Sequence, residues 1–199
     1  MKPVLYMLAL LGLLGSGQVQ AFELDELAAQ LSEHAVVRGP FIQEKHLRAL
    51  PQPLSSQGDF VLSAERGLLW QLRSPMRQDY RIDTQGIARH TPDGWQMQPG
   101  QDVAAQQSRL FLAVLKGDHS GLAHDFELQL SGTQDAWQLL LTPRSVLLRQ
   151  IFDSIRISGG ALVERIELNE TQGDRSVLRM PQSQAGSALS EQERNAFEH

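Results

Sequence analysis

The sequence predicts an α+β fold in which an antiparallel sheet of roughly nine to eleven short strands is combined with two helices. Three observations support this prediction. Apolar residues alternate with period two in many short segments, which is typical of half-buried strands. The period becomes helical in only two places, and short turns join consecutive strand segments, which favours antiparallel pairing. With no repeat and no interior linker, residues 22–199 are predicted to form a single domain.

The N-terminal segment has the organisation of an export signal. Lys2 supplies a positive start, an apolar run extends from Val4 to Leu14, and small residues precede a cleavage position after Ala21. The run is too short for a transmembrane helix, which needs about 20 residues. The sequence contains no cysteine, and therefore no disulfide and no lipid-anchoring cysteine. We expect residues 1–21 to be a signal peptide and the mature protein to be periplasmic.

The N-terminal half of the mature chain begins with a predicted helix over 22–36, where Leu24, Leu27, Ala28 and Leu31 recur at helical spacing. The period then changes to two, and prolines and serines mark a loop between the first two strands. A Pro-Asp-Gly turn joins the last two strands of this half into a hairpin. Strands are predicted at 39–47, 58–63, 67–73, 77–83, 86–90 and 94–97.

The C-terminal half begins with a second predicted helix over 104–115, which is followed by a lysine and a glycine that favour a helix end. The segment 146–152 fits neither period clearly. The polar segment from about 181 is left open between order and partial disorder, although Ser190 and Glu193 have the spacing of a capping box. Strands are predicted at 126–130, 137–141, 155–157, 162–168 and 176–180.

The charge balance argues against nucleic acid as a partner. The formal net charge is −5, and it becomes −6 without the leader, which contains Lys2 and no acidic residue. A mildly acidic chain with scattered arginines lacks the basic stripe of a nucleic-acid-binding domain. It also contains no polybasic stretch of the kind that binds anionic lipid headgroups. No segment of the mature chain is long and apolar enough to span a membrane, so a soluble protein is expected.

No group of residues in the sequence resembles a reaction centre. His119 and His124 lie near two aspartates, but they lack the spacing that places two imidazoles on one helix face. We expect both in a solvated loop, without a catalytic or metal-binding role. Ser145 and Ser176 lack the flanking glycines of a nucleophile elbow. The sequence therefore predicts a protein that is not an enzyme and that uses no cofactor or metal.

Large apolar side chains are concentrated on one face of the predicted sheet, and two helices are available to cover it. A filled core and a hydrophobic ligand cavity would place the same residues inside, so periodicity leaves both interpretations open. If the face lines a lipid-binding cavity, the residues expected to line it are Phe41, Phe60, Leu62, Leu68, Trp70, Tyr80, Ile82, Leu128 and Leu139 from the strands, with Leu110 and Phe111 from the second helix.

Three motifs in order resemble the periplasmic outer-membrane lipoprotein carrier family, the LolA-like proteins. They are Phe41 to Lys45, Gly58 to Phe60, and Gly67 to Trp70 shortly before Pro75. Weaker matches follow, so that the resemblance covers nearly the whole mature chain. It implies an open, incomplete antiparallel barrel of about eleven strands whose concave apolar face is covered by helices and holds acyl chains.

The resemblance also implies a function. Such a monomeric carrier takes a lipidated cargo from an inner-membrane donor complex to an outer-membrane acceptor. The family's lid-pinning arginine is replaced here by Ala64, with Arg66 two residues later. This departure indicates a divergent branch, for which a glycolipid or an aryl-polyene lipid is the alternative cargo.

Two other classes of function remain open at this point. One is a binding module for a membrane partner protein, which would normally be tethered to the membrane. The other is a lipid hydrolase, which needs a nucleophile and a base that the sequence does not offer.

Overall fold

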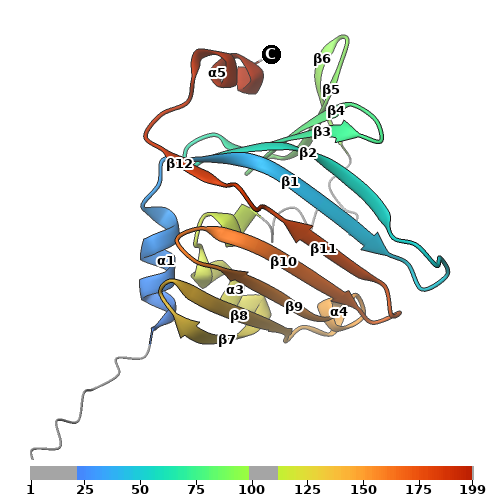
Figure 1. The fold of residues 1–199 in the computed structure, drawn as a ribbon, viewed down its shortest axis with the longest axis vertical. Coiled ribbons are helices and arrows are strands. Elements are labelled where there is room, and N and C mark those ends of the chain that lie inside the picture. Colours follow the sequence, from blue (N-terminus) through green and yellow to red (C-terminus); the bar gives the residue numbers. More distant parts are fainter. Residues whose placement is uncertain (1–21, 99–111, 199) are drawn as a thin grey trace, which may run out of the picture.

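The computed structural model describes residues 22–98 and 112–198. The predicted open antiparallel sheet of eleven strands is confirmed: the strands follow the order β6-β5-β4-β3-β2-β1-β11-β10-β9-β8-β7, and β12 pairs with β1 (Figure 1). The strands are β1 (Val36–His46), β2 (Leu54–Ser63), β3 (Gly67–Ser74), β4 (Gln78–Asp83), β5 (Gly86–Thr91), β6 (Gly94–Met97), β7 (Phe126–Thr133), β8 (Ala136–Pro143), β9 (Phe152–Gly159), β10 (Val163–Glu170), β11 (Arg175–Arg179) and β12 (Gln184–Gly186).

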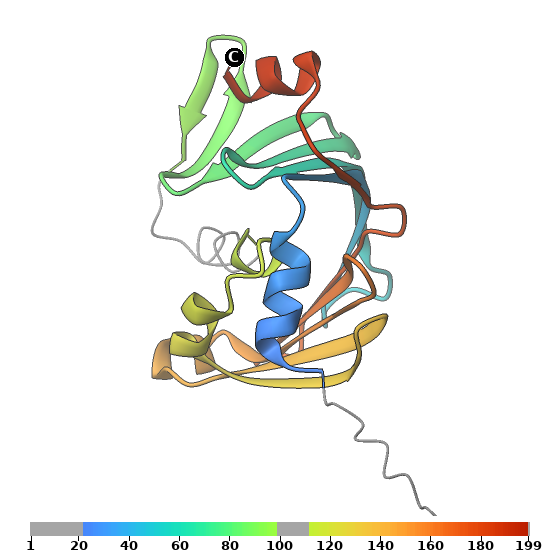
Figure 2. The same ribbon diagram turned by 90° about the vertical axis from the view of Figure 1, so that its left-hand side faces the viewer.

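Two runs of hairpins make up the sheet. Strands β1 to β6 follow one another in space as in sequence, and so do β7 to β11. The two runs join where β11 pairs with β1, so β6 and β7 are the outer strands of the order. The sheet curves around helix α1 (Leu24–Ser32), which lies on its concave side (Figure 2). The strands therefore form an incomplete barrel with helices at its opening.

The first helix is confirmed but shorter than predicted. It ends at Ser32 because the chain joins the sheet at Val36, which lies opposite Ser63. The second predicted helix is described only in part: residues 112–115 are helical, and the rest of the predicted helix lies outside the described residues.

Two further short helices appear where the sequence predicted none. Residues 119–125 form α3 (His119–Asp125), so the prediction of a solvated loop there is wrong. The Asp118 side chain caps this helix by accepting a hydrogen bond from the Gly121 amide at 3.2 Å. The segment that fitted neither period contains α4 (Val146–Arg149), where the Ser145 hydroxyl accepts a hydrogen bond from the Leu148 amide at 3.2 Å.

The C-terminal segment takes regular structure and packs on the sheet. Strand β12 pairs antiparallel with the first three residues of β1. Helix α5 (Glu191–Glu198) follows, and its predicted capping box is confirmed. The Ser190 amide donates to the Glu193 carboxylate at 2.7 Å, and the Glu193 amide donates to the Ser190 hydroxyl at 3.2 Å. Helix α5 lies beside the β4–β6 part of the sheet, away from α1 (Figure 2).

The sheet buries apolar side chains on both of its faces. The larger core lies on the concave side and includes the inward residues of β1 to β4 and β8 to β10, together with apolar residues of α1, 112–115 and α3. A smaller core lies on the convex side and consists of Val36, Val61, Leu69 and Phe197, with Trp95, Leu189 and Ala196 packed against it.

Candidate apolar-chain site on the concave face

The predicted site residues of β2, β3 and β4 lie on the concave face in two cross-strand rows. In the first row Trp70 lies between Phe60 and Tyr80, and in the second Leu68 lies between Leu62 and Ile82. Because residues directly opposite one another on an antiparallel pair share a face, each row is a continuous apolar band across three strands. The sidedness that the alternation predicted for these six residues is confirmed; Leu68 is fully buried, whereas Trp70 and Tyr80 are half-buried.

Aromatic rings form the centre of this face. Phe41 stacks on Trp70 with the ring centroids 3.6 Å apart, and Phe60 lies 6.4 Å from the same ring. Gly58 lies opposite Phe41, and a Cβ atom there would approach the Phe41 ring to 2.9 Å. The same Cβ would overlap the backbone carbonyl of Gln71 on β3, so the glycine of the second motif is required first by the close approach of β3 and then by the Phe41 ring.

The other half of the concave face comes from β7, β8 and β9. Leu139 lies opposite Ile157, and Leu141 lies between Leu128 and Ile155. Leu139, Leu141, Ile155 and Ile157 are buried, whereas Leu128 is half-buried. The predicted site residues Leu128 and Leu139 therefore belong to this half, some distance along the sheet from the aromatic cluster. Leu110 and Phe111 lie outside the described residues.

Trp137 is a member of this face that the predicted site omitted. It is buried, and its indole Nε1 donates to the Gly160 carbonyl at 2.7 Å. The Gln30 amide of α1 donates to the same carbonyl at 2.6 Å. Trp137 begins the strand pattern Trp-x-Leu-x-Leu, in which alternate residues share a face. This pattern was the available sequence signal that Trp137 lies on the same face as Leu139.

Helices cover the concave face mainly through apolar contacts. The buried residues are Leu27 and Leu31 of α1, Leu112, Val114 and Leu115 of the helical segment 112–115, and Leu122 of α3. A void of about 20 Å³ remains between these helices and the strand residues Trp137, Leu139 and Ile157. Among the described residues, α1, α3 and the segment 112–115 are therefore closely packed against β8 and β9.

Two side-chain hydrogen bonds tie the covering helices to the edge of the sheet. One is the bond from Gln30 to the Gly160 carbonyl. The other joins the Lys116 ammonium to the Ala64 carbonyl at 2.9 Å. Ala64 is the residue that the family resemblance placed at the lid-pinning arginine, and here its backbone carbonyl accepts from a lysine of the covering segment.

Arg66 has a different role. Its guanidinium pairs with the Glu198 carboxylate at 2.8 Å, which ties the β2–β3 turn to α5 on the convex side. Among the described residues, this partner of Arg66 is therefore on α5 and not on the helices that cover the concave face.

The polar residues considered for catalysis are dispersed. The His124 side chain is 87% exposed and contacts Asp125 at 2.9 Å, whereas Ser145 caps α4 and Ser176 is buried in β11. Within 22–98 and 112–198, no group of three or more His, Cys, Asp or Glu side chains is placed to hold a metal ion. No helix in the same ranges has the length and apolar character needed to cross a membrane.

A second concavity lies on the convex side and was not predicted. It is a cleft of about 800 Å³ between β1–β3 and the C-terminal segment, lined mostly by polar side chains such as Asp59, Gln71 and Gln182. Arg38 closes one side of it by donating to the Glu193 carboxylate at 2.6 Å and to the Ala188 carbonyl at 2.9 Å.

The Glu193 carboxyl is held in its charged form. Partial burial alone would raise its pKa, but hydrogen bonds from the Ser190 amide and the Arg38 guanidinium outweigh burial and lower the pKa below its ordinary value of 4.5. The C-terminal segment is thus fixed to the convex side by a charged clamp.

An open antiparallel sheet whose concave apolar face is covered by short helices defines a class of small single-domain binding folds. The chain belongs to the family described as outer membrane lipoprotein carrier protein LolA-like, which its sequence matches over residues 16–195. The resemblance drawn from the three sequence motifs is therefore confirmed.

Two solved structures share this fold. A chain in the MucA/MucB complex of Pseudomonas aeruginosa aligns with a TM-score of 0.51 and 18% identity, covering 85% of this chain and 58% of that chain. A LolA superfamily protein from Nitrosomonas europaea aligns with a TM-score of 0.50 and 11% identity, covering 84% of this chain and 95% of that chain. A comparison with curated protein sequences gives no match.

Proposed function

We propose that this protein is a periplasmic carrier that binds the acyl or other apolar chains of a lipidated cargo against its concave face. The observation that carries the proposal is the continuous apolar face, which extends from the aromatic cluster around Trp70 to the leucines and isoleucines of β8 and β9. In this proposal the export signal is cleaved after Ala21, and the carrier moves as a monomer from an inner-membrane donor to an outer-membrane acceptor.

The physical requirement on such a carrier is to shield chains from water without chemistry. Transfer of each methylene out of water is favourable by about 0.8 kcal/mol, so a chain of about 16 carbons needs shielding worth roughly 12 kcal/mol. An apolar face supplies this shielding without directional groups. The absence of a catalytic constellation from the sequence is consistent with this task.

Because α1, α3 and the segment 112–115 pack closely against β8 and β9, a chain that binds at those strands displaces these helices. In the proposal α1, 112–115 and α3 move away from the sheet, and the chain takes their place against Leu68, Trp70 and Leu139. The contacts that must break are mostly apolar and are replaced by equivalent contacts with the chain. The helix-to-rim hydrogen bonds from Gln30 and Lys116 are polar contacts that oppose opening.

The experiment is to purify the exported protein under mild conditions, extract bound material and identify it by mass spectrometry. We expect a lipidated protein or a glycolipid or aryl-polyene lipid in stoichiometric amount, and an N-terminus at Phe22. A delipidated sample should then bind a fluorescent acyl probe with saturation. Absence of both bound lipid and saturable probe binding would contradict the proposal.

A protein partner is the second candidate function. It is favoured by the fold likeness to a chain found in a protein complex, MucA/MucB, and by the large cleft on the convex side. In that case the chain would act as a binding module for a membrane partner protein. Retention of such a partner by the purified protein, with no bound lipid, would select this function over the carrier.

A further inference from the structure

The turns at the two ends of the sheet differ in composition. The end of β1 lies beside the start of β11, the end of β10 beside the start of β9, and the end of β3 beside the start of β2. In Figure 1 the end of β1 and helix α4 both lie at the right of the molecule. We call four segments at this end the arginine edge; they are residues 47–54, 75–77, 144–151 and 171–175. The β5–β6 turn, which contains Asp93, and the start of β7, which follows Asp125, lie at the same end.

The arginine edge exposes large apolar side chains. Seven such side chains are exposed among the described residues, and five of them lie here. They come from three separate segments, and two of them, Val146 and Leu147, are neighbours on α4. They are Leu50 (45% exposed), Leu54 (54%), Met76 (66%), Val146 (65%) and Leu147 (56%).

Basic side chains lie between these apolar ones. The edge contains one carboxylate, Asp174, whose Oδ1 accepts a hydrogen bond from the Arg48 backbone amide at 2.8 Å. No ion pair joins the edge guanidinium groups to a carboxylate of residues 22–98 or 112–198. The edge contains five exposed arginines, namely Arg48, Arg77, Arg144, Arg149 and Arg175.

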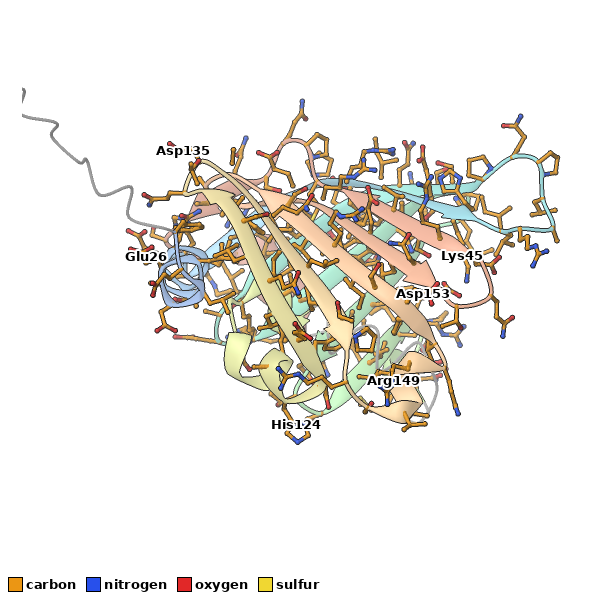
Figure 3. The ribbon with its side chains drawn as sticks, turned by 90° about the horizontal axis from the view of Figure 1, so that it is seen from below. Glu26, Lys45, His124, Asp135, Arg149 and Asp153 are labelled. Carbon is orange, nitrogen blue, oxygen red and sulfur yellow. The ribbon has the colours of Figure 1, made fainter. Side chains whose placement is uncertain are left out.

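The turns at the opposite end have the reverse charge. They include the acidic residues Glu33, Glu65 and Asp135, and their arginine, Arg66, is paired with Glu198. In Figure 3, Lys45, Arg149 and the acidic Asp153 lie toward one end of the molecule, and Glu26 and Asp135 lie toward the other. A molecule with a negative net charge therefore presents one end that attracts anions.

Hydrogen bonds hold the segments of the arginine edge in place. The Thr171 hydroxyl donates to the Gln150 carbonyl at 2.9 Å, and its amide donates to the Ile151 carbonyl at 3.2 Å. The Arg144 amide donates to the Asp125 carbonyl at 2.8 Å. The segments 47–54, 144–151 and 171–175 are thus connected to one another by hydrogen bonds.

We propose that the arginine edge docks this protein on the surface of an anionic lipid bilayer. Leu50, Met76, Val146 and Leu147 enter the interface between headgroups and acyl chains, and the five arginines bind headgroup phosphates. Single apolar side chains interspersed with basic ones are the pattern of interfacial membrane binding. No stretch of the sequence is polybasic; the fold collects arginines from four separate segments.

A lipid surface fits this edge better than a protein partner does. Stable protein interfaces have a contiguous apolar core surrounded by a polar rim, whereas the apolar side chains here are separated by arginines. The acidic opposite end is repelled by an anionic surface, so docking has one favoured orientation. The proposal is independent of what the concave face binds.

The test uses the mature chain and vesicles of phosphatidylcholine with or without phosphatidylglycerol. We expect sedimentation with the anionic vesicles alone, weakening as salt is raised. The variant R144Q/R149Q should lose about thirtyfold in vesicle affinity, since each arginine near an anionic surface contributes about fivefold. The control Arg66→Gln, at the opposite end, should bind vesicles like the parent, and acyl-probe binding should be unchanged in both.

A second measurement locates the contact. Because the sequence contains no cysteine, Val146→Cys can carry a single environment-sensitive fluorophore, and Met97→Cys provides a matched exposed position away from the edge. The label at 146 should shift to the blue on anionic vesicles, and the label at 97 should not. Equal binding to neutral vesicles, unchanged affinity of R144Q/R149Q, or equal shifts at both labels would overturn the proposal. Failure to bind any vesicle would equally overturn it, and would leave a protein partner as the occupant of this edge.

Discussion

The two faces of the same strands are covered in different ways. Leu68 and Leu69 are neighbours on β3, and both are buried, but Leu68 faces the concave core and Leu69 the convex one. The helices that cover the concave face contact it mainly through apolar side chains. Among the described residues, two hydrogen bonds, from Gln30 and Lys116, join these helices to the edge of the sheet. The cover of the convex face is one helix, α5, which is held by arginines of β1, β4 and the β2–β3 turn.

This difference has a physical consequence. Apolar contacts are non-directional, so another apolar surface can replace a helix on the concave face at little cost. Charge-assisted hydrogen bonds fix geometry, as in the bond from Arg81 to the Phe197 carbonyl at 2.7 Å. We therefore interpret the concave cover as displaceable by an apolar ligand and the convex cover as held in one geometry by polar contacts.

The largest effect is expected from Phe41→Ala. Phe41 is 1% exposed and stacks on Trp70, so its removal opens a cavity in the larger core. The free energy of unfolding should fall by about 3–5 kcal/mol, as measured by urea denaturation followed by circular dichroism. A loss below about 1 kcal/mol would show that the aromatic cluster is not tightly packed in solution.

Phe197→Ala should have a smaller effect on the same measurement. Phe197 is 4% exposed in the smaller core, but α5 can detach without unfolding the sheet, so the loss cannot exceed the free energy of docking α5. We expect about 1–2 kcal/mol, together with faster amide exchange in 191–198. A loss as large as that of Phe41→Ala would show that the convex core is integral to the domain.

Strands β2 and β3 show how far the sequence could predict the structure. Period-two alternation placed Phe60, Leu68 and Trp70 on one face, and that face is correct. It made no prediction for Val61 and Leu69 on the other face of these strands, and both are buried. Consecutive apolar residues at both places were the available signal, since strands buried on both faces lose their alternation.

Other features depend on contacts that no local pattern reports. The Arg38–Glu193 clamp joins residues from opposite ends of the domain. Local signals did exist for the helices. Ser190 and Glu193 correctly predicted the start of α5. Asp118 could have predicted the start of α3, but the neighbouring Gly117 was interpreted only as the end of the preceding helix. The arginine edge depends on topology, because only hairpin pairing brings its four segments together.

Lys116→Met should affect opening of the concave cover more than the stability of the core. It keeps the apolar stem and removes the hydrogen bond to the Ala64 carbonyl. The free energy of unfolding should fall by only about 0.5–1 kcal/mol, while the affinity for an acyl probe should rise about two- to fivefold because opening costs less. The matched change Arg66→Met, which releases α5 instead, should leave probe affinity unaltered; equal effects of both variants on probe binding would argue against a displaceable cover.

The smallest effect is expected from pH. The pKa of Glu193 is lowered in the folded protein, so its contribution to α5 docking is fully present above its ordinary value of 4.5 and is lost as the pH falls through the lower folded value. Amide chemical shifts of α5 should therefore move toward coil values in that acidic window while those of β8 and β9 stay unchanged. In Glu193→Gln this pH response should disappear, and its persistence would assign the response to another group.

The most direct test of the carrier proposal compares two adjacent residues. Leu68→Asn and Leu69→Asn each bury a polar amide of similar volume on β3, so both should lower the free energy of unfolding by similar amounts, about 2–4 kcal/mol. Saturable binding of a fluorescent acyl probe, measured below both unfolding transitions, should weaken about 5- to 100-fold in Leu68→Asn, because the chain must desolvate the new amide. Binding by Leu69→Asn should match the parent. Equal probe affinities for the two variants, or no saturable binding by the parent, would contradict the assignment of the concave face as the site for apolar chains.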